Sequence, residues 1–224
     1  VNVKGFMLQP VGPEALGWFK EPINSMEDFR KYRFRTPPGL PGQTYKDIGV
    51  ASVAMGGGGI LPALEKGTID AAEWCCPKPD SDFGFQKVLK HYYLQGLHQV
   101  VVNADMYLNK DVYNKLTDHQ KKAMEVAANA SLMKMVARRI YENGEALLDL
   151  TENHGVKLHD TPADYFPAYM NAANALLEKN AAENEFFAKV WQSQKDFARI
   201  AVPFWAGAQT SNAMLGKAYA DSVK

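Results

Sequence analysis

The fold is indicated most clearly by residues 60–74, which read ILPALEKGTIDAAEW. The first half predicts a short helix, because Pro62 fits the first turn of a helix and Gly67 is typical of the position just past its end. Residues 68–74 then predict a short strand that ends at Glu73 and Trp74. A helix that leads directly into a strand is typical of an α/β domain.

The same alternation continues on both sides of this stretch. Before it, Pro and Gly separate short apolar runs, and after it the runs are longer. We predict strands at 3–8, 31–36, 51–55 and 99–108, helices at 43–48 and 82–95, and a short helical turn at 15–20, with Pro10 ending the first strand. The N-terminal half therefore predicts an α/β arrangement.

The C-terminal half is predominantly helical. Thr117 and Gln120 have the spacing of a capping box, and apolar residues recur at helical spacing as far as His154-Gly155. A helix over residues 118–153 would be roughly 50 Å long at 1.5 Å per residue, so we expect it to lie across two domains or to reach a partner. A short strand at 156–159 and helices starting at 161 and spanning 183–200 are expected to follow.

Composition excludes several classes of protein. The 224 residues include 25 basic and 25 acidic side chains, so the chain lacks the excess positive charge that nucleic-acid binding requires. With 46% hydrophobic residues it can bury a sizeable core, and no apolar run approaches the roughly 20 residues that span a bilayer. The sequence predicts a globular protein of one large or two small domains.

The two cysteines, Cys75 and Cys76, are adjacent. Two cysteines cannot form a disulfide framework or a cysteine-rich zinc site, and neighbouring cysteines seldom bridge because the geometry is strained. We therefore expect two small buried side chains. The chain opens Val-Asn-Val-Lys-Gly, without Met or a signal peptide, so it has been processed or is part of a longer protein.

Few residues suggest chemistry by themselves. Arg33 and Arg35 lie on one face of a predicted strand, where they could pair with a carboxylate or could simply be solvated. Glu73 and Trp74 end a strand, where they could wall a small pocket or could pack against the core and water. The glycine run 56–59 lacks a P-loop ending and is expected to be a flexible turn. The five histidines are scattered, and we expect most of them at the surface.

Taken in series, short motifs resemble the DctP-like solute-binding proteins of tripartite ATP-independent periplasmic (TRAP) transporters, in particular the branch that binds 2-oxo acids and related monocarboxylates. The motif over residues 60–74 is the most specific one. The others occur in the same order along nearly the whole chain: GWFK at 17–20 with PI at 22–23, KYRFRTP at 31–37, FGF at 83–85, YY at 92–93 and LNK at 108–110.

The resemblance implies a set of site residues. By its position before Thr36-Pro37, Arg35 rather than Arg33 would pair with the ligand carboxylate. Glu73, with the main chain of Trp74, would hold a cation that bridges to the ligand, and Glu14 takes the place of a glutamine ligand of that branch. A second carboxylate favours Ca²⁺ over Na⁺. The ligand-binding residues expected are Arg35, Trp18, Trp74 and Asp105, and the metal-binding residues are Glu73, Trp74 and Glu14.

The resemblance also implies a periplasmic-binding-protein-like fold of two α/β lobes joined by crossing strands. Residues 1–10 would form a crossing strand from the first lobe, 11–100 the second lobe, 101–160 a crossing strand with the long spanning helix, and 161–224 C-terminal helices that could form a homodimer. The family is longer, so this chain is expected to begin about a third of the way in and to lack most of the N-terminal half of its first lobe.

The function implied is an extracytoplasmic receptor that captures a small carboxylate such as pyruvate or lactate and delivers it to the membrane permease subunits, without catalysis. One alternative is a small α/β enzyme, with Glu73 as general base and Arg35 as anchor, although the sequence shows no second acid/base group near Glu73. Another is a helical interaction protein built on residues 118–200.

Overall fold

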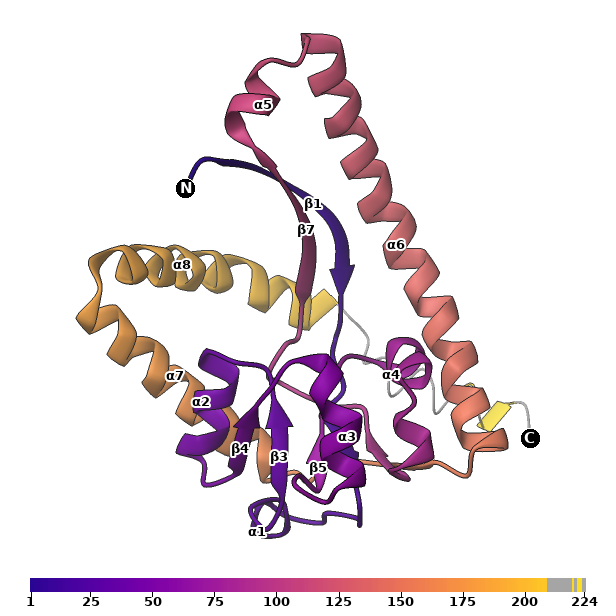
Figure 1. Cartoon of the computed structure of the whole chain (residues 1–224). Coiled ribbons are helices and arrows are strands. Elements are labelled where there is room, and N and C mark those ends of the chain that lie inside the picture. Colours follow the sequence, from indigo (N-terminus) through magenta and orange to yellow (C-terminus); the bar gives the residue numbers. More distant parts are fainter. Residues whose placement is uncertain (209–218, 220, 223–224) are drawn as a thin grey trace. The chain divides into compact units, whose positions relative to one another are not determined.

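The computed structural model describes residues 1–208, 219 and 221–222. The chain forms two compact units, residues 1–173 and 174–224. The predicted α/β class is confirmed by the first unit, in which strands and helices alternate (Figure 1). None of the helices in the described part of the chain combines the length and the apolar character that crossing a membrane requires.

Eight strands lie in the described residues of the first unit, and they make a sheet and a ribbon. The sheet has the order β4-β3-β5-β2-β6-β8, and the ribbon pairs β1 with β7. The strands are β1 (Val3–Val11), β2 (Gly17–Phe19), β3 (Arg33–Thr36), β4 (Ala51–Ala54), β5 (Ala71–Ala72), β6 (His91–Tyr93), β7 (Val102–Asn109) and β8 (Lys157–His159). β3 runs parallel to β4 and β5, whereas β2 runs antiparallel to β5 and β6.

The helices connect these strands or extend beyond them. They are α1 (Met26–Phe29), α2 (Leu40–Asp47), α3 (Ile60–Glu65), α4 (Pro77–Phe83), α5 (Lys110–Asn114), α6 (Asp118–Asn153), α7 (Tyr165–Glu183) and α8 (Glu185–Ala208). The predicted boundaries of the long helix are confirmed by α6, which begins with the capping box of Thr117 and Gln120. The part of the predicted C-terminal helical region at 209–218, 220 and 223–224 lies outside the described residues.

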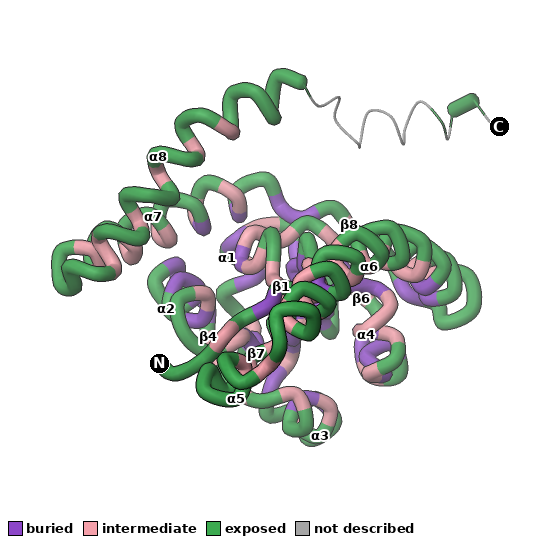
Figure 2. The backbone as a smooth tube through the Cα atoms, turned by 90° about the horizontal axis from the view of Figure 1, so that it is seen from above, coloured by how far each residue is buried: buried purple, intermediate pink, exposed green. Residues whose placement is uncertain are grey.

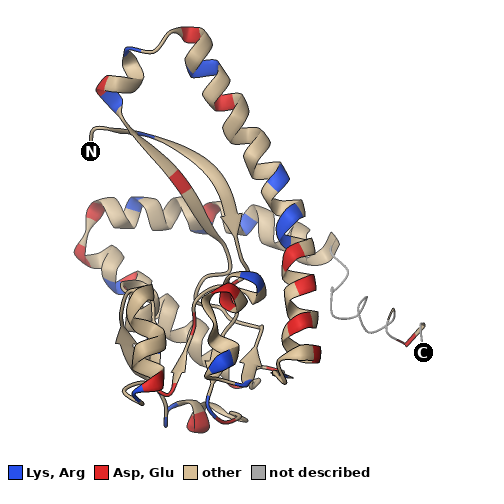
Figure 3. Ribbon diagram, turned by 45° about the vertical axis from the view of Figure 1, so that its right-hand side comes forward, with Lys and Arg blue, Asp and Glu red and all other residues tan. Residues whose placement is uncertain are grey.

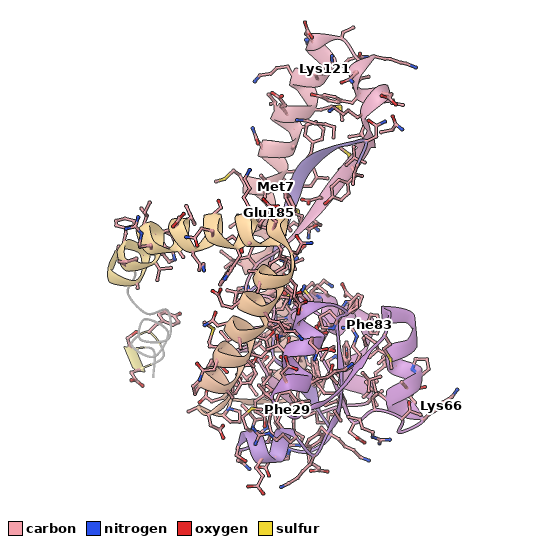
Figure 4. The ribbon with its side chains drawn as sticks, turned by 90° about the vertical axis from the view of Figure 1, so that its left-hand side faces the viewer. Met7, Phe29, Lys66, Phe83, Lys121 and Glu185 are labelled. Carbon is pink, nitrogen blue, oxygen red and sulfur yellow. The ribbon has the colours of Figure 1, made fainter. Side chains whose placement is uncertain are left out.

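Apolar side chains pack on both faces of the sheet. Trp18 and Phe19 are consecutive on β2 and point to opposite faces, each into its own cluster. The cluster around Phe19 also holds Phe29 and Tyr165, and the cluster around Trp18 also holds Leu150 from the end of α6. We call the sheet and the helices that cover it the lobe. Figure 4 shows its crowded side chains, among which Phe29 and Phe83 are labelled.

The long helix and the ribbon form an arm that leaves the lobe (Figure 1). Met7 on β1 and Lys121 near the start of α6 lie on this arm (Figure 4). Figure 2 shows that α6 is exposed along most of the arm, and its buried residues are Ala128, Ala146 and Leu150. The last turns of α6 are therefore anchored in the core of the lobe, while its first half runs along the ribbon.

The described residues of the second unit are mostly helical, and none of them is buried. Its main element is α8, which begins at Glu185 and has no buried residue. Glu178 accepts hydrogen bonds from Trp191 Nε1 at 2.8 Å and from Lys195 Nζ at 3.0 Å, which hold α7 and α8 together. Exposed aromatic residues such as Phe197 and Phe204 lie along α8.

Two predicted elements and one predicted strand end were wrong. Residues 15–20 form β2 rather than a helical turn, because Gly17 at φ 136° lets β2 approach β5 so closely that a Cβ would lie 2.7 Å from the Ala72 oxygen. The predicted helix over 82–95 is instead the end of α4 followed by β6, since Gly84 at φ 102° ends α4. Pro10 does not end β1, because β1 pairs only with β7 and has a free edge.

Candidate functional site

Four polar side chains from separate parts of the chain meet inside the first unit. Arg35, Glu73, Glu14 and His98 are each less than 10% exposed. Arg35 lies on β3 and Glu73 follows β5, and since these strands are parallel neighbours their carboxyl ends share one edge of the sheet. We refer to these four residues as the polar cluster.

Main-chain hydrogen bonds place the other two members of the polar cluster. Glu14 lies in the connection between β1 and β2, where its N–H donates to the Gln99 oxygen at 3.1 Å. The next residue, Ala15, donates to the Cys75 oxygen at 2.7 Å, which ties this connection to the segment after Glu73. His98 lies in the connection between β6 and β7. The cluster therefore depends on contacts among three loops that are distant in sequence.

The strongest contact in the cluster joins Arg35 to Glu73. Arg35 Nη1 donates to Glu73 Oε1 at 2.6 Å and to the Glu73 main-chain oxygen at 2.8 Å. Arg35 Nε and Nη2 donate to the Met55 oxygen at 3.0 and 2.9 Å. A guanidinium has five N–H donors, so one Nη2 hydrogen is left for a further acceptor. The guanidinium also lies 5.3 Å from the ring centre of Trp74.

His98 faces both carboxylates of the cluster. Its Nε2 lies 3.6 Å from Glu14 Oε2 and 3.6 Å from Glu73 Oε2. Burial lowers the pKa of His98, but the two carboxylates outweigh burial and hold this pKa above its ordinary value. On the other side of the ring, Nδ1 lies 3.1 Å from the Tyr45 hydroxyl, which in turn lies 3.2 Å from the Tyr165 hydroxyl.

Three buried atoms of the cluster lack a hydrogen-bond partner in the described structure: Glu14 Oε2, Glu73 Oε2 and His98 Nε2. One ligand atom from each of the three residues lies within 4.8 Å of the others. Buried polar atoms are nearly always satisfied, so this arrangement fits an ion or a polar ligand placed among them. Two carboxylate oxygens and an imidazole nitrogen suit a small cation.

The structure brings together Arg35, Glu73 and Glu14 of the residues expected from the sequence. Trp74 lies beside them, half-buried, with its ring 5.1 Å from that of Phe83. The carboxylates of Glu14 and Glu73 converge on one point although 59 positions separate them in the sequence. The roles assigned to these residues in binding stay predictions.

Arg33 has a different environment from Arg35. Its Nε and Nη2 donate to the two carboxylate oxygens of Asp70, each at 2.7 Å, and its side chain is 48% exposed. Both arginines are paired with a carboxylate, but Arg33 is paired at the surface and Arg35 is paired within the buried polar cluster. The geometry thus separates two arginines that a strand pattern treats alike.

Two of the expected ligand-binding residues, Trp18 and Asp105, lie outside the polar cluster. Trp18 is fully buried in the core, where it stacks on Tyr92 at 4.1 Å and donates from Nε1 to Asp80 at 2.8 Å. It therefore packs the core instead of walling a pocket. Asp105 is exposed on β7, where it accepts hydrogen bonds from its strand neighbours Asn103 and Tyr107, and it is not part of the polar cluster.

The sequence did not identify His98 as a functional residue. His98 is 8% exposed and is thus an exception to the expectation that most of the histidines lie at the surface. No local motif surrounds it, because its partners Glu14 and Glu73 come from other loops. The nearest signal is its position just before β7, close to where the chain leaves the lobe.

Comparisons with known proteins agree on one family. Residues 2–184 match the family of bacterial extracellular solute-binding proteins, family 7. A monocarboxylate 2-oxoacid-binding periplasmic protein from Nostoc sp. is 31% identical over 198 residues, which are 88% of this chain and 54% of the relative. The chain thus spans about half the length of this curated relative.

Solved structures show the same fold. A TRAP transporter solute-binding protein from Bordetella bronchiseptica, a dimer with copurified calcium and picolinate, has a TM-score of 0.88 and 28% identity over 99% of this chain and 65% of that one. A TRAP periplasmic solute-binding protein from Pseudoalteromonas atlantica, with bound sodium and pyruvate, has a TM-score of 0.76 and 26% identity over 93% of this chain and 65% of that one. The expectation of a periplasmic-binding-protein-like fold is confirmed.

Proposed function

The chain belongs to the bacterial extracellular solute-binding proteins of family 7, and from this premise we propose that it is the receptor part of a TRAP transporter that captures a small 2-oxo or 2-hydroxy acid outside the cytoplasm. The observation that carries the proposal is the buried polar cluster, in which a guanidinium and two carboxylates face one another. The relatives named above support a monocarboxylate and a cation as its occupants.

Arg35 is the residue proposed to bind the ligand carboxylate. Its free Nη2 hydrogen, and its burial among the Met55 oxygen and the Trp74 ring, give a carboxylate a charged donor with little competition from water. Glu73 occupies the Nη1 side of the guanidinium. A ligand carboxylate would therefore bind on the Nη2 side or would displace part of the Glu73 contact.

Charge balance in the cluster favours a cation alongside the ligand. Glu14 and Glu73 with Arg35 leave one net negative charge, and a ligand carboxylate adds a second. A divalent cation makes the complete set neutral when His98 is uncharged, whereas sodium leaves one negative charge in a buried site, which is costly. We propose Glu14, Glu73 and the main chain of Trp74 as its ligands, with His98 as an uncharged neighbour.

The residues of the chain perform binding rather than bond chemistry in this proposal. Arg35 orients the carboxylate and Trp74 covers the guanidinium. His98 exchanges its proton for the cation, because a charged imidazole and a cation would repel each other between the same carboxylates. Ligand binding then shifts an equilibrium between open and closed receptor, and the closed form is delivered to the permease subunits.

Calorimetry with pyruvate, with and without added Ca²⁺, tests the assignment. Arg35→Lys keeps the charge but loses the planar fork, so we expect pyruvate affinity to fall by at least about tenfold. Arg33→Lys, on the same strand but exposed, is the matched control and should leave affinity unchanged. Equal affinities for the two variants would contradict the role of Arg35.

The cation is tested separately with Glu14→Gln. This change keeps the shape of the side chain and removes one negative charge, so the stimulation of pyruvate binding by Ca²⁺ should weaken. Glu21→Gln, at an exposed position, is its control. Pyruvate binding that ignores both Ca²⁺ and a chelator would argue against a cation and leave the carboxylate site standing.

One observation supports an enzymatic alternative. The structure places His98 beside Glu73, which supplies the second acid/base group that the sequence did not reveal. The family assignment favours the receptor, because the proteins in it are transport receptors. A turnover assay on 2-oxo and 2-hydroxy acids separates the two: saturable binding without product supports the receptor, and product formation supports the enzyme.

A homodimer is a further proposal, supported by the dimer of the Bordetella protein and by the exposed aromatic residues of α8. Phe197 and Phe204 are 71% and 70% exposed. Light scattering of the wild type and of a Phe197→Ser variant tests it, since a dimer built on α8 should dissociate more readily in the variant.

A further inference from the structure

The two cysteines of the chain lie directly after Glu73-Trp74, at the start of α4. Both are buried, with Cys75 7% and Cys76 4% exposed, and both are free thiols. Their sulfur atoms are in contact, 2.6 Å apart. These are the two cysteines of the sequence, so a disulfide within residues 1–224 can join only them.

A positive charge lies against this thiol pair. Arg139 reaches it from α6, with Nη2 3.3 Å from Cys75 Sγ and 2.5 Å from Cys76 Sγ. Arg139 belongs to a basic stretch in the middle of α6 that includes Lys134 and Arg138, seen as blue segments in Figure 3. An adjacent cation is the environment that distinguishes a reactive cysteine from an inert buried one.

The pair can be reached from one side. A groove of about 500 Å³ is lined by Cys76 and Arg139 together with apolar side chains of α6 and of the connection before β2. Cys75 does not line this groove. A small reagent in the groove therefore meets Cys76 rather than Cys75, and the Cys75 sulfur lies in contact with the Cys76 sulfur.

We propose that Cys75 and Cys76 form a redox modification site, which a low-molecular-weight disulfide such as oxidised glutathione converts to a vicinal disulfide. Cys76 Sγ attacks one sulfur of the oxidant, so a mixed disulfide forms and one glutathione leaves. Cys75 Sγ then attacks the Cys76 sulfur, and the second glutathione leaves. The two cysteines are oxidised, the oxidant is reduced, and both thiol protons end on the released glutathione molecules.

This disulfide would be labile rather than structural. Neighbouring Cα atoms are about 3.8 Å apart, below the usual separation of about 4.4–6.8 Å in disulfides, so the bond is strained and easily reduced. Strained disulfides are the ones that exchange and regulate. The same strain explains why adjacent cysteines seldom form a permanent structural disulfide, and it agrees with a reversible disulfide between Cys75 and Cys76.

The test uses the full chain equilibrated in mixtures of reduced and oxidised glutathione. Each sample is quenched with acid, denatured so that buried thiols become accessible, and alkylated with iodoacetamide. The mass of the protein is then measured by mass spectrometry. We expect two alkyl groups at the reducing end, none with a loss of two hydrogens at the oxidising end, and full reversal with added thiol.

Single variants identify the order of events. Cys75→Ser keeps the sulfur that lines the groove but removes its resolving partner, so it should accumulate an adduct of one glutathione. Cys76→Ser keeps the cysteine that does not line the groove and should form that adduct more slowly. Circular dichroism of both variants establishes that they are folded.

Two outcomes would overturn the proposal. One is a wild type that keeps two alkylatable thiols at every glutathione ratio. The other is a wild type that stops at a glutathione adduct or a disulfide-linked dimer, because the neighbouring sulfur then fails to resolve it. None of these readouts involves pyruvate or a cation, so the result is independent of the proposed receptor function.

Discussion

Replacement of Arg35 by methionine removes the guanidinium that holds Glu73 while keeping a side chain of comparable length. The side chains of this pair are only 5% and 1% exposed, and their closest atoms are 2.6 Å apart. In the variant the buried Glu73 carboxylate loses its Arg35 donor. The Met55 oxygen also loses both of its hydrogen bonds from the guanidinium.

The cost follows from that burial. Removing one partner of a buried ion pair destabilises a protein by about 3–5 kcal/mol, because the remaining charge is left uncompensated. Arg33→Met breaks a pair of the same type on the same strand, but its side chains are 48% and 25% exposed. An exposed pair is worth about 0–1 kcal/mol, since water replaces the lost partner. The two variants should therefore differ by at least about 2 kcal/mol.

Urea denaturation followed by circular dichroism measures this difference as the free energy of unfolding. A double variant, Arg35→Met with Glu73→Gln, should be more stable than Arg35→Met alone, because the uncompensated charge is then absent. Equal costs for Arg35→Met and Arg33→Met would refute the reasoning. So would a double variant that is no more stable than the single one.

Three further predictions concern the surroundings of the site. Because Glu14 and Glu73 raise the pKa of His98 despite its burial, its charge stabilises the fold below its ordinary pKa of about 6.5. That contribution disappears as pH rises through the raised value. The stability advantage of wild type over His98→Gln in urea titrations should thus be largest below about pH 6.5 and should shrink as the pH rises through the raised pKa of His98, and a pH-independent difference would argue against it. In Gly57→Ala the new Cβ would lie 2.7 Å from the Trp74 ring, so overpacking should cost about 1–3 kcal/mol of unfolding free energy and shift tryptophan fluorescence, whereas Gly58→Ala meets nothing within 4 Å and should change neither. Trp18→Phe loses the buried hydrogen bond of the indole and should lower the melting temperature, at about 1–3 kcal/mol, while leaving pyruvate affinity in calorimetry unchanged; a large loss of affinity would restore Trp18 to the pocket.

The sequence correctly predicted the helices and strands that are specified by residues within their own segment. The capping box at Thr117 and the uninterrupted helical spacing after it are contained within the segment they describe, and α6 has the expected ends. The stretch 60–74 likewise gives α3 and β5 in order. Predictions failed where a neighbouring strand decides the conformation, as for β2, whose Gly17 is required by contact with Ala72.

Some residues of the site were indicated by the sequence, and others were not. The motifs, read as a family resemblance, pointed to Arg35, Glu73 and Glu14, and these three residues do meet in the structure. His98 was missed because its partners lie 84 and 25 positions away, and no short pattern records such a contact. Trp18 was misplaced because its direction depends on the alternation of a strand that the sequence did not reveal.

Short-range patterns in the sequence predicted the α/β class and the long helix, and the resemblance of its motifs to a known family indicated Arg35 and Glu73. Only the tertiary structure decided that Arg35 is buried while Arg33 is exposed, that His98 lies between two carboxylates, and that the two cysteine sulfurs meet an arginine from α6. Those outcomes depend on the order β3-β5-β2 in the sheet and on where the end of α6 docks, and both are set by packing among residues far apart in the chain.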